Sequence, residues 1–167
     1  MLALSVRDLA KSFGARTLFR DVSFEIEAGE KVALFGPNGC GKSTLLNIIS
    51  GRLEPDSGSV WRQPGAVLGY LPQALQFPGD VTPSDLCHDP AALRRFGIEP
   101  AVASMPVSSL SAGQQRRTGL AQVWAAQPEL IMLDEPTNHL DAPAMDQLAR
   151  LIRESRAAVL LVSHDRY

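Results

Sequence analysis

Apolar and polar residues alternate in two segments near the start of the chain. Residues 2–8 and 22–27 show this pattern, and in the second segment Val22, Phe24 and Ile26 fall on one face. A period of two is typical of a strand with one buried face. The pattern therefore predicts two half-buried strands, with a connection that contains Phe13.

Several later runs are apolar without alternation. Residues 31–35, 130–133 and 157–162 have strand length and few polar positions. Such runs are typical of strands buried on both faces, as in a parallel sheet that helices cover. We expect three buried strands here, and two further strands at residues 59–61 and 67–71.

Helical signals lie between these predicted strands. Residues 44–50 form an apolar run that Gly51 can end. Ser111 and Gln114 have the spacing of a capping box, which predicts a helix to about residue 126. Asp141 caps a further predicted helix, whose inner face is expected to carry Met145, Leu148, Ala149 and Ile152. Two short helices are expected at residues 82–86 and 91–96, within a small helical part at about residues 74–128.

The strongest chemical signal follows the predicted strand at residues 31–35. The segment matches the phosphate-loop pattern of Gly, four residues of any kind, Gly-Lys, and Ser or Thr. Its residues are Gly36, Pro37, Asn38, Gly39, Cys40, Gly41, Lys42, Ser43 and Thr44. Backbone N–H groups and the helix N-terminus favour a bound phosphate, which Lys42 can reach while the Ser43 hydroxyl binds Mg²⁺. We expect a nucleotide-binding site.

Polar side chains stand at the carboxyl ends of two other predicted strands. Gln73 follows the strand at residues 67–71, and Asp134 and Glu135 end the run that starts at residue 130. Ligands of open α/β sheets bind at that edge. Asp134 and Gln73 can hold Mg²⁺, and Glu135 or Gln73 can orient the attacking water. The alternatives are that Gln73 is a loop residue and that Glu135 caps a turn.

A second anion site is predicted where the helix after residue 110 begins. Ser111, Ala112, Gly113 and Gln114 combine a capped helix N-terminus with a glycine. The alternative is that Ser111 has only a structural role and caps the helix. Two phosphate sites for one nucleotide are redundant within one molecule, which suggests a nucleotide shared between two molecules.

Two further residues have less specific signals. His164 follows the last apolar run and can donate a hydrogen bond to phosphate or water, although a histidine at a strand end is more often structural. Phe13 can stack on adenine or belong to the core, and the pattern does not separate these alternatives.

Bulk composition narrows the class of protein. The 167 residues have the size of one domain, and a net charge of −2 gives no overall field that recruits DNA or an anionic membrane. No apolar run approaches the roughly 18 residues of a membrane span, and no signal peptide opens the chain. Cys40 and Cys87 lack metal-site spacing and are expected to be reduced thiols. We expect a cytoplasmic protein that reaches a membrane only through a partner.

Together, the motifs resemble the nucleotide-binding domain of the ATP-binding cassette (ABC) ATPases. In order, residues 36–44 look like the Walker A loop, Gln73 falls at the Q-loop, and residues 110–114 match the family's signature motif. Residues 130–135 look like Walker B, residues 138–141 are similar to the D-loop, and His164 to the switch histidine. Phe13 falls where the family places an aromatic that stacks on adenine. The resemblance covers essentially the whole chain, residues 1–167, as a single domain.

This resemblance implies a fold and a mechanism. The fold is an α/β phosphate-loop NTPase with a mostly parallel sheet between helices, an N-terminal antiparallel β subdomain and a short helical subdomain. ATP and Mg²⁺ are the implied cofactors. Two such domains dimerise head to tail, so that Ser111 and Gly113 contact ATP held by the partner's Walker A loop. Glu135 and His164 position the attacking water, and Lys42 takes up developing charge.

The biological role has several possible forms. The chain has a single cassette, and its residues 111–117 look like those of ATPase subunits of membrane transporters. The segments at residues 135–141 and 163–167 look like the ABC-F proteins that act on ribosomes, which normally carry two cassettes. A third possibility is a truncated cassette that binds nucleotide with little turnover. The helical part between Gln73 and Leu110 is short for the family, and because that part normally docks on a transporter's membrane subunit, its length argues against such coupling. Relatives continue past Tyr167, so we expect the last strand to be weakly supported.

Overall fold

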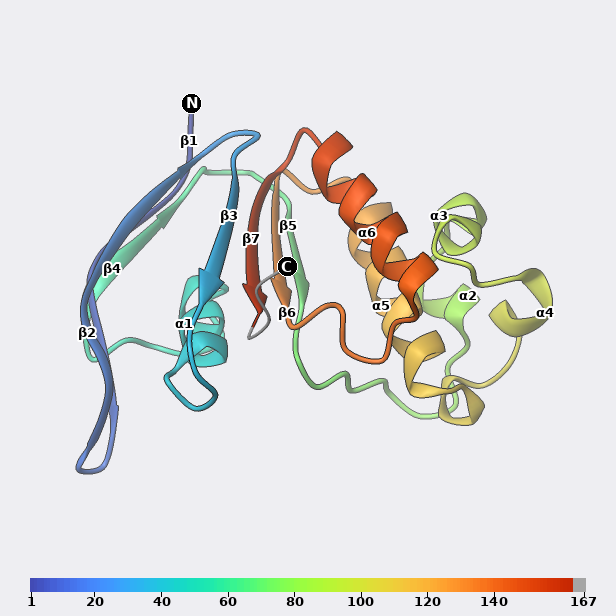
Figure 1. Ribbon diagram of the computed structural model, residues 1–167, viewed down its shortest axis with the longest axis horizontal. Coiled ribbons are helices and arrows are strands. Elements are labelled where there is room, and N and C mark those ends of the chain that lie inside the picture. Colours follow the sequence, from blue (N-terminus) through green and yellow to red (C-terminus); the bar gives the residue numbers. More distant parts are fainter. Residues whose placement is uncertain (164–167) are drawn as a thin grey trace.

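The computed structural model describes residues 1–163, which form two sheets and a set of helices (Figure 1). The first sheet is antiparallel, with the strand order β2-β1-β4. Its strands are β1 (Leu2–Phe13), β2 (Arg16–Glu27) and β4 (Ser57–Arg62). The predicted N-terminal strands are confirmed, but both are longer than the alternation indicated, because β1 and β2 continue into a hairpin that turns at residues 14 and 15.

The second sheet has the strand order β3-β7-β6-β5, and every neighbouring pair is parallel. Its strands are β3 (Lys31–Phe35), β5 (Leu68–Leu71), β6 (Leu130–Asp134) and β7 (Ala158–Ser163). Because parallel strands share one direction, the loops that follow β3, β5 and β6 leave the sheet at the same edge. Figure 1 shows this edge at the bottom of the sheet.

Alternate side chains of β6 and β7 belong to two separate cores. Ile131, Leu133 and Val159 pack in a cluster with α5 (Ala112–Ala125) and α6 (Ala142–Glu154). Leu130, Met132, Ala158, Leu160 and Val162 pack in a cluster with α1 (Lys42–Ile49) and the antiparallel sheet. The apolar runs of these strands are thus explained by burial on both faces.

Two predictions about strands need correction. The strand at residues 31–35 is not buried: Lys31, Ala33 and Phe35 are exposed, because β3 lies at the edge of the sheet and packs through one face only. Conversely, the last strand is not weakly supported, because β7 is buried and is paired with β3 on one side and β6 on the other.

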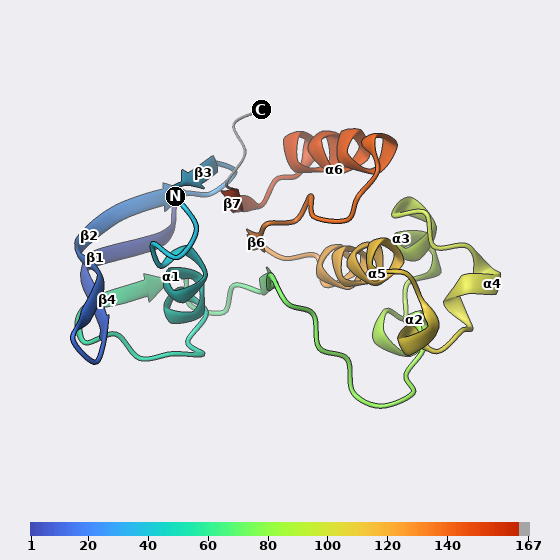
Figure 2. The ribbon, with the colours of Figure 1, turned by 60° about the horizontal axis from the view of Figure 1, so that its bottom comes forward.

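The remaining helices gather on one side of the parallel sheet. These are α2 (Pro83–Leu86), α3 (Pro90–Arg95), α4 (Pro100–Ala103) and the 3₁₀ helix η1 (Val107–Ser109). The first two were predicted; α4 and η1 were not. Figures 1 and 2 show these helices beside α5, whereas α1 lies on the opposite side of the sheet with the antiparallel strands. Within residues 1–163, every helix is too short or too polar to cross a membrane.

The inner face of α6 is rotated from the predicted one. Leu148 is buried as expected, but its buried partner is Leu151 rather than Met145 or Ile152. Met145, Ala149 and Ile152 are only partly buried and line a shallow apolar groove with Leu161. The apolar stripe of α6 is therefore wider than the surface that α5 and the sheet cover.

Candidate active site

The predicted phosphate loop joins the end of β3 to the start of α1. Gly41 precedes the helix with a φ of 102°, a left-handed conformation that side chains rarely adopt. A Cβ atom there would also lie 2.9 Å from Phe19. Among residues 1–163 no side chain caps α1, so the N–H groups of its first turn are available to an anion. The Lys42 ammonium donates to the carbonyls of Gly36 and Pro37, at 2.7 and 3.0 Å, and closes the loop on itself.

Residues from three strand ends meet above this loop. They surround a cavity of about 380 Å³, which is lined by Leu18, Asn38, Gly39, Gly41, Lys42, Ser43, Thr44, Gln73, Asp134 and Glu135. The Ser43 hydroxyl donates to the side-chain oxygen of Gln73 at 3.5 Å, the outer limit of a hydrogen bond. The structure thus brings together the phosphate-loop, Q-loop and Walker B residues that lay far apart in the sequence.

Asp134 is the buried acid of this cavity. It is 1% exposed, and within the described part of the chain neither carboxylate oxygen has a hydrogen-bond partner. Burial raises the pKa of Asp134. The nearby Ser43 hydroxyl acts to lower this pKa, although its geometry does not meet that of a hydrogen bond. A buried carboxylate without partners is costly unless a cation completes it.

The residues around Asp134 fit Mg²⁺. This ion takes oxygen ligands and is usually bound by one or two carboxylates together with substrate phosphates and water. Asp134 supplies a carboxylate, Ser43 a hydroxyl and Gln73 an amide oxygen, and all three line the same cavity. Tyr70 lies nearby at the edge of the sheet, and burial followed by the charge of Asp134 raises its pKa to about 12.

Glu135 follows Asp134 in an unusual backbone conformation. Its φ is 49°, and its N–H donates to the Val162 carbonyl at 2.9 Å. The residue is 4% exposed and lines the phosphate-loop cavity. A non-glycine residue held in the left-handed region costs of order 1–3 kcal/mol and is typical of functional sites. Glu135 thus combines a strained backbone with a place in the lining of the phosphate-loop cavity.

The signature residues lie elsewhere. Ser111, Ala112, Gly113 and Gln114 do not line the phosphate-loop cavity, and α5 lies across the parallel sheet from α1 (Figures 1 and 2). The capping box is present: the Gln114 N–H donates to the Ser111 hydroxyl at 3.2 Å, and the Ser111 N–H donates to the Gln114 side chain at 3.0 Å. A Cβ atom on Gly113 would lie 2.6 Å from the His139 carbonyl oxygen, so close packing alone explains this glycine.

The two less specific predictions have different outcomes. Phe13 stands at the tip of β1 and is 53% exposed, which excludes the core alternative. Its ring lies 5.6 Å from the Lys11 ammonium and does not line the phosphate-loop cavity. His164 lies outside the described residues.

Three residues of the site were not predicted from the sequence. Leu18 lines the cavity, and the Arg16 guanidinium donates to the Gly39 carbonyl at 3.0 Å. Both belong to β2, which the long hairpin brings to the phosphate loop. Arg116 donates to the carbonyls of Gln73 and Glu135. No local pattern indicates these contacts, because they depend on how distant segments pack.

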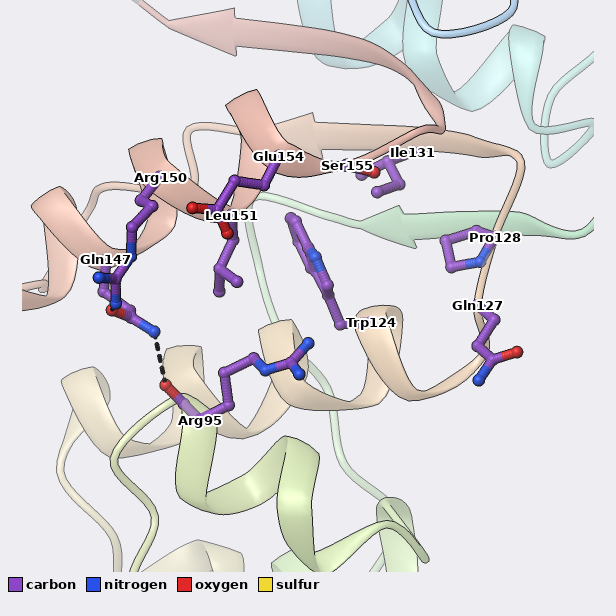
Figure 3. A pocket seen from close by; sticks show the side chains of 10 residues that line it. All are labelled: Arg95, Trp124, Gln127, Pro128, Ile131, Gln147, Arg150, Leu151, Glu154 and Ser155. Atoms are coloured by element: carbon purple, nitrogen blue, oxygen red, sulfur yellow. Dashed lines mark hydrogen bonds between the residues drawn. The ribbon is translucent and has the colours of Figure 1, made fainter.

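A second cavity, of about 550 Å³, lies away from the phosphate loop. Figure 3 shows it between α3, α5 and α6, with Trp124 facing the cavity and Arg95 at its rim. The Gln147 amide donates to the Arg95 carbonyl at 3.3 Å across one end. None of the phosphate-loop, Q-loop or Walker B residues lines it, so the smaller cavity is the candidate active site.

The phosphate loop, the buried Asp134 and the parallel sheet define a phosphate-loop NTPase. The family is equally clear: a family model described as "ABC transporter" matches residues 19–138, and the chain belongs to that family of ATP-hydrolysing domains. It is 41% identical over 174 residues to the ribosome protection protein VmlR of Bacillus subtilis, covering 98% of this chain and 32% of VmlR. It is 40% identical over 183 residues to the zinc import ATP-binding protein ZnuC of Cereibacter sphaeroides, covering 99% of this chain and 74% of ZnuC.

Solved structures agree with the family. The ATP-binding subunit of an ABC transporter superposes with a TM-score of 0.87 at 27% identity, covering 97% of this chain and 79% of that subunit. The expected α/β fold with an N-terminal antiparallel sheet is confirmed. The chain spans about a third of VmlR and about three quarters of ZnuC, so these proteins extend beyond the segment they share with it.

Proposed function

We propose that the chain hydrolyses MgATP as one half of a pair of cassettes. Each ATP lies between the phosphate loop of one cassette and residues 111–114 of the other. The observation that carries this proposal is the separation within one chain: residues 111–114 do not line the cavity that holds Lys42, Asp134 and Glu135. A capped helix N-terminus with a glycine is suited to phosphate, and a second molecule can present it there.

The described residues divide the chemistry among them. The first-turn N–H groups of α1 and the Lys42 ammonium bind the phosphates, and Phe13 stacks on the adenine. Asp134, Ser43 and Gln73 hold Mg²⁺, which neutralises phosphate charge when bound. Glu135 orients the attacking water and accepts its proton. His164, outside the described residues, is proposed to donate a further hydrogen bond to phosphate or water.

The proposed partner is a membrane-spanning transporter subunit. The likeness to the zinc import ATP-binding protein ZnuC and to the ATP-binding subunit of an ABC transporter supports this role. Closure and opening of the cassette pair would move that partner. The chain would then work in the cytoplasm, at the inner face of the membrane.

A second candidate role is action on the ribosome. The 41% identity to the ribosome protection protein VmlR favours it, as does the 40% identity over 171 residues to the ATP-binding protein Uup of Caulobacter vibrioides. The ATP site is the same in both roles, and the partner differs.

The ATP site is tested with Glu135→Gln, which keeps the shape of the side chain and removes the base. The rate of ATP hydrolysis falls about 100-fold or more, because general base catalysis contributes that much. Size-exclusion chromatography with light scattering then shows a dimer that forms only with MgATP. Glu154→Gln, on the exposed end of α6, is the matched control and keeps wild-type turnover. Turnover per molecule that is independent of protein concentration would contradict the shared site.

The partner is identified by affinity purification of Glu135→Gln from native cells with MgATP present. Co-purification of an integral membrane subunit supports the transporter role. Co-sedimentation with ribosomes supports the second role. Recovery of ATP-bound dimer with neither partner contradicts both.

A further inference from the structure

Arg116, in the second turn of α5, has the most deeply buried cationic side chain of the described residues. It is 3% exposed, whereas arginine is almost never buried unless its donors are satisfied. Its guanidinium makes three hydrogen bonds, all to backbone carbonyls. One nitrogen donates to Pro72 at 2.7 Å, and another donates to Gln73 at 3.1 Å and to Glu135 at 3.0 Å.

These three carbonyls belong to the two loops that carry proposed active-site side chains. Pro72 and Gln73 follow β5, and Glu135 follows β6. Both segments have left the sheet, so their inward carbonyls need donors from elsewhere. The rigid fork of one guanidinium supplies donors to both loops at once, which a lysine ammonium cannot do with the same geometry.

The side chains of the two held residues face the nucleotide cavity. Gln73 accepts a hydrogen bond from Arg116 on its backbone, while its amide oxygen meets the Ser43 hydroxyl at 3.5 Å. Glu135 is held in the same way at its carbonyl and lines the same cavity. Arg116 therefore contacts neither the phosphate loop nor the nucleotide position, but fixes the backbone of two residues that do.

The charge of Arg116 acts on the same site through space. Burial lowers the pKa of the guanidinium, while the charges of Asp134 and Glu135 raise it. In return, the positive charge favours the ionised form of Asp134. A neutral residue of similar size at position 116 would lose both the three bonds and this field.

We propose that Arg116 is a positioning residue for ATP hydrolysis: its three hydrogen bonds set Gln73 and Glu135 against the phosphate loop. It stands five residues after Ser111, in the helix that Ser111 caps. The signature end of α5 is thereby connected to the active site of its own chain. This inference rests on the roles proposed above for Gln73 and Glu135.

The test compares Arg116→Lys with Arg94→Lys, a matched change at an exposed position of α3. A misplacement of about 1 Å can cost on the order of 100-fold in rate. We expect kcat of Arg116→Lys to fall about 10- to 100-fold, with KM for ATP and the affinity for a fluorescent ATP analogue within about twofold of wild type. Arg94→Lys keeps wild-type kcat. An unchanged kcat in Arg116→Lys would overturn the proposal.

A double-mutant cycle separates positioning from general stability. If Arg116 acts in part through Gln73, Arg116→Lys lowers kcat by a smaller factor in the Gln73→Ala background than in wild type, and the remaining loss reflects Glu135. A purely structural role predicts that the two losses multiply, and that result would overturn the proposal. Hydrogen exchange on the nucleotide-free protein adds a readout independent of activity: amides at residues 73–75 and 135–138 lose protection in Arg116→Lys but not in Arg94→Lys.

The same experiments distinguish this inference from the proposed function. Loss of turnover in Glu135→Gln and Gln73→Ala, with normal turnover in Arg116→Lys, removes the inference alone. Normal turnover in Glu135→Gln removes the proposed roles on which the inference rests.

Discussion

The helices α1 and α5 both begin beside glycines, but different groups satisfy their first turns. In α1 the N-cap is Gly41, and no side chain of the described residues caps the helix. In α5 the Ser111 hydroxyl and the Gln114 side chain close a complete capping box. The first helix leaves donors for a phosphate, whereas the second is stable with its own cap. This difference fits the proposal that α1 binds ATP in one chain and α5 meets ATP only when a second molecule approaches.

The largest expected effect comes from Ser111→Asp. Aspartate caps a helix as well as serine does, so the free energy of unfolding should stay within about 1 kcal/mol of wild type. The new charge would face the partner's ATP, and like charges in an interface cost several kcal/mol. We expect turnover to fall about 100-fold while one chain still binds ATP.

The control is Ser111→Ala, which removes the cap without adding charge. It should lower stability by about 1 kcal/mol, and Tm by about 2–4 °C. Wild-type turnover in Ser111→Asp would show that no phosphate approaches this helix and would break the comparison with α1.

The second effect concerns the α1 side. Lys42→Met removes the ammonium that now bonds the Gly36 and Pro37 carbonyls. A hydrogen bond to a charged group contributes about 1.5–3 kcal/mol, so ATP affinity should fall about 10- to 100-fold. Equilibrium binding of a fluorescent ATP analogue measures it. Lys31→Met, at the opposite end of β3, is the matched control and should leave the affinity unchanged.

A smaller effect is expected from Asp134→Asn, which should stabilise the nucleotide-free protein. Burial raises the pKa of Asp134, so its ionisation opposes folding and the nucleotide-free protein loses stability as pH rises through the raised pKa. Removing the buried charge should raise stability at pH 7 by about 1 kcal/mol, or Tm by about 2–4 °C. The increase should vanish at a pH below the ordinary aspartate range.

The same variant should lose the additional thermal stabilisation that Mg²⁺ gives in the presence of ATP. Thermal unfolding with ATP, with and without Mg²⁺, measures this loss. A variant that is less stable than wild type at pH 7 and keeps the Mg²⁺ effect would contradict the assignment of Asp134 to the metal.

The smallest effect is expected from Phe13→Ala. The ring is exposed, so its removal should change the free energy of unfolding by less than about 0.5 kcal/mol. An aromatic stacking contact contributes about 0.5–1.5 kcal/mol, so ATP affinity should fall about 2- to 10-fold. An unchanged affinity would leave the hairpin tip without a part in nucleotide binding.

Sequence patterns predicted the parts of the fold that depend on near neighbours. The phosphate loop, the capping box at Ser111 and the apolar strands β6 and β7 follow from residues a few positions apart. The exposure of β3 was not predictable in this way, because its five residues look as apolar as a buried strand. One face of β3 is open to solvent because the strand lies at the edge of the sheet.

The candidate site shows the same division. Lys42, Ser43, Asp134 and Glu135 were found from motifs, and the structure places them around one cavity. Arg116 was not found, because its partners Pro72 and Glu135 lie far from it in the sequence and are recognised through backbone carbonyls. Backbone acceptors exist at every residue, so only their positions in space distinguish these from any other.

By itself the sequence determined that this chain carries a phosphate loop, a self-capped signature helix and acids at a strand end. Each of these depends on local chemistry: glycine conformations, a hydroxyl two or three residues from an N–H, an apolar run before a carboxylate. Tertiary structure decided which of them face the same cavity. Because β6 and β7 bury opposite faces against α1 and α5, packing places the two helix N-termini on different sides of one sheet, and thereby separates one half of the proposed ATP site from the other.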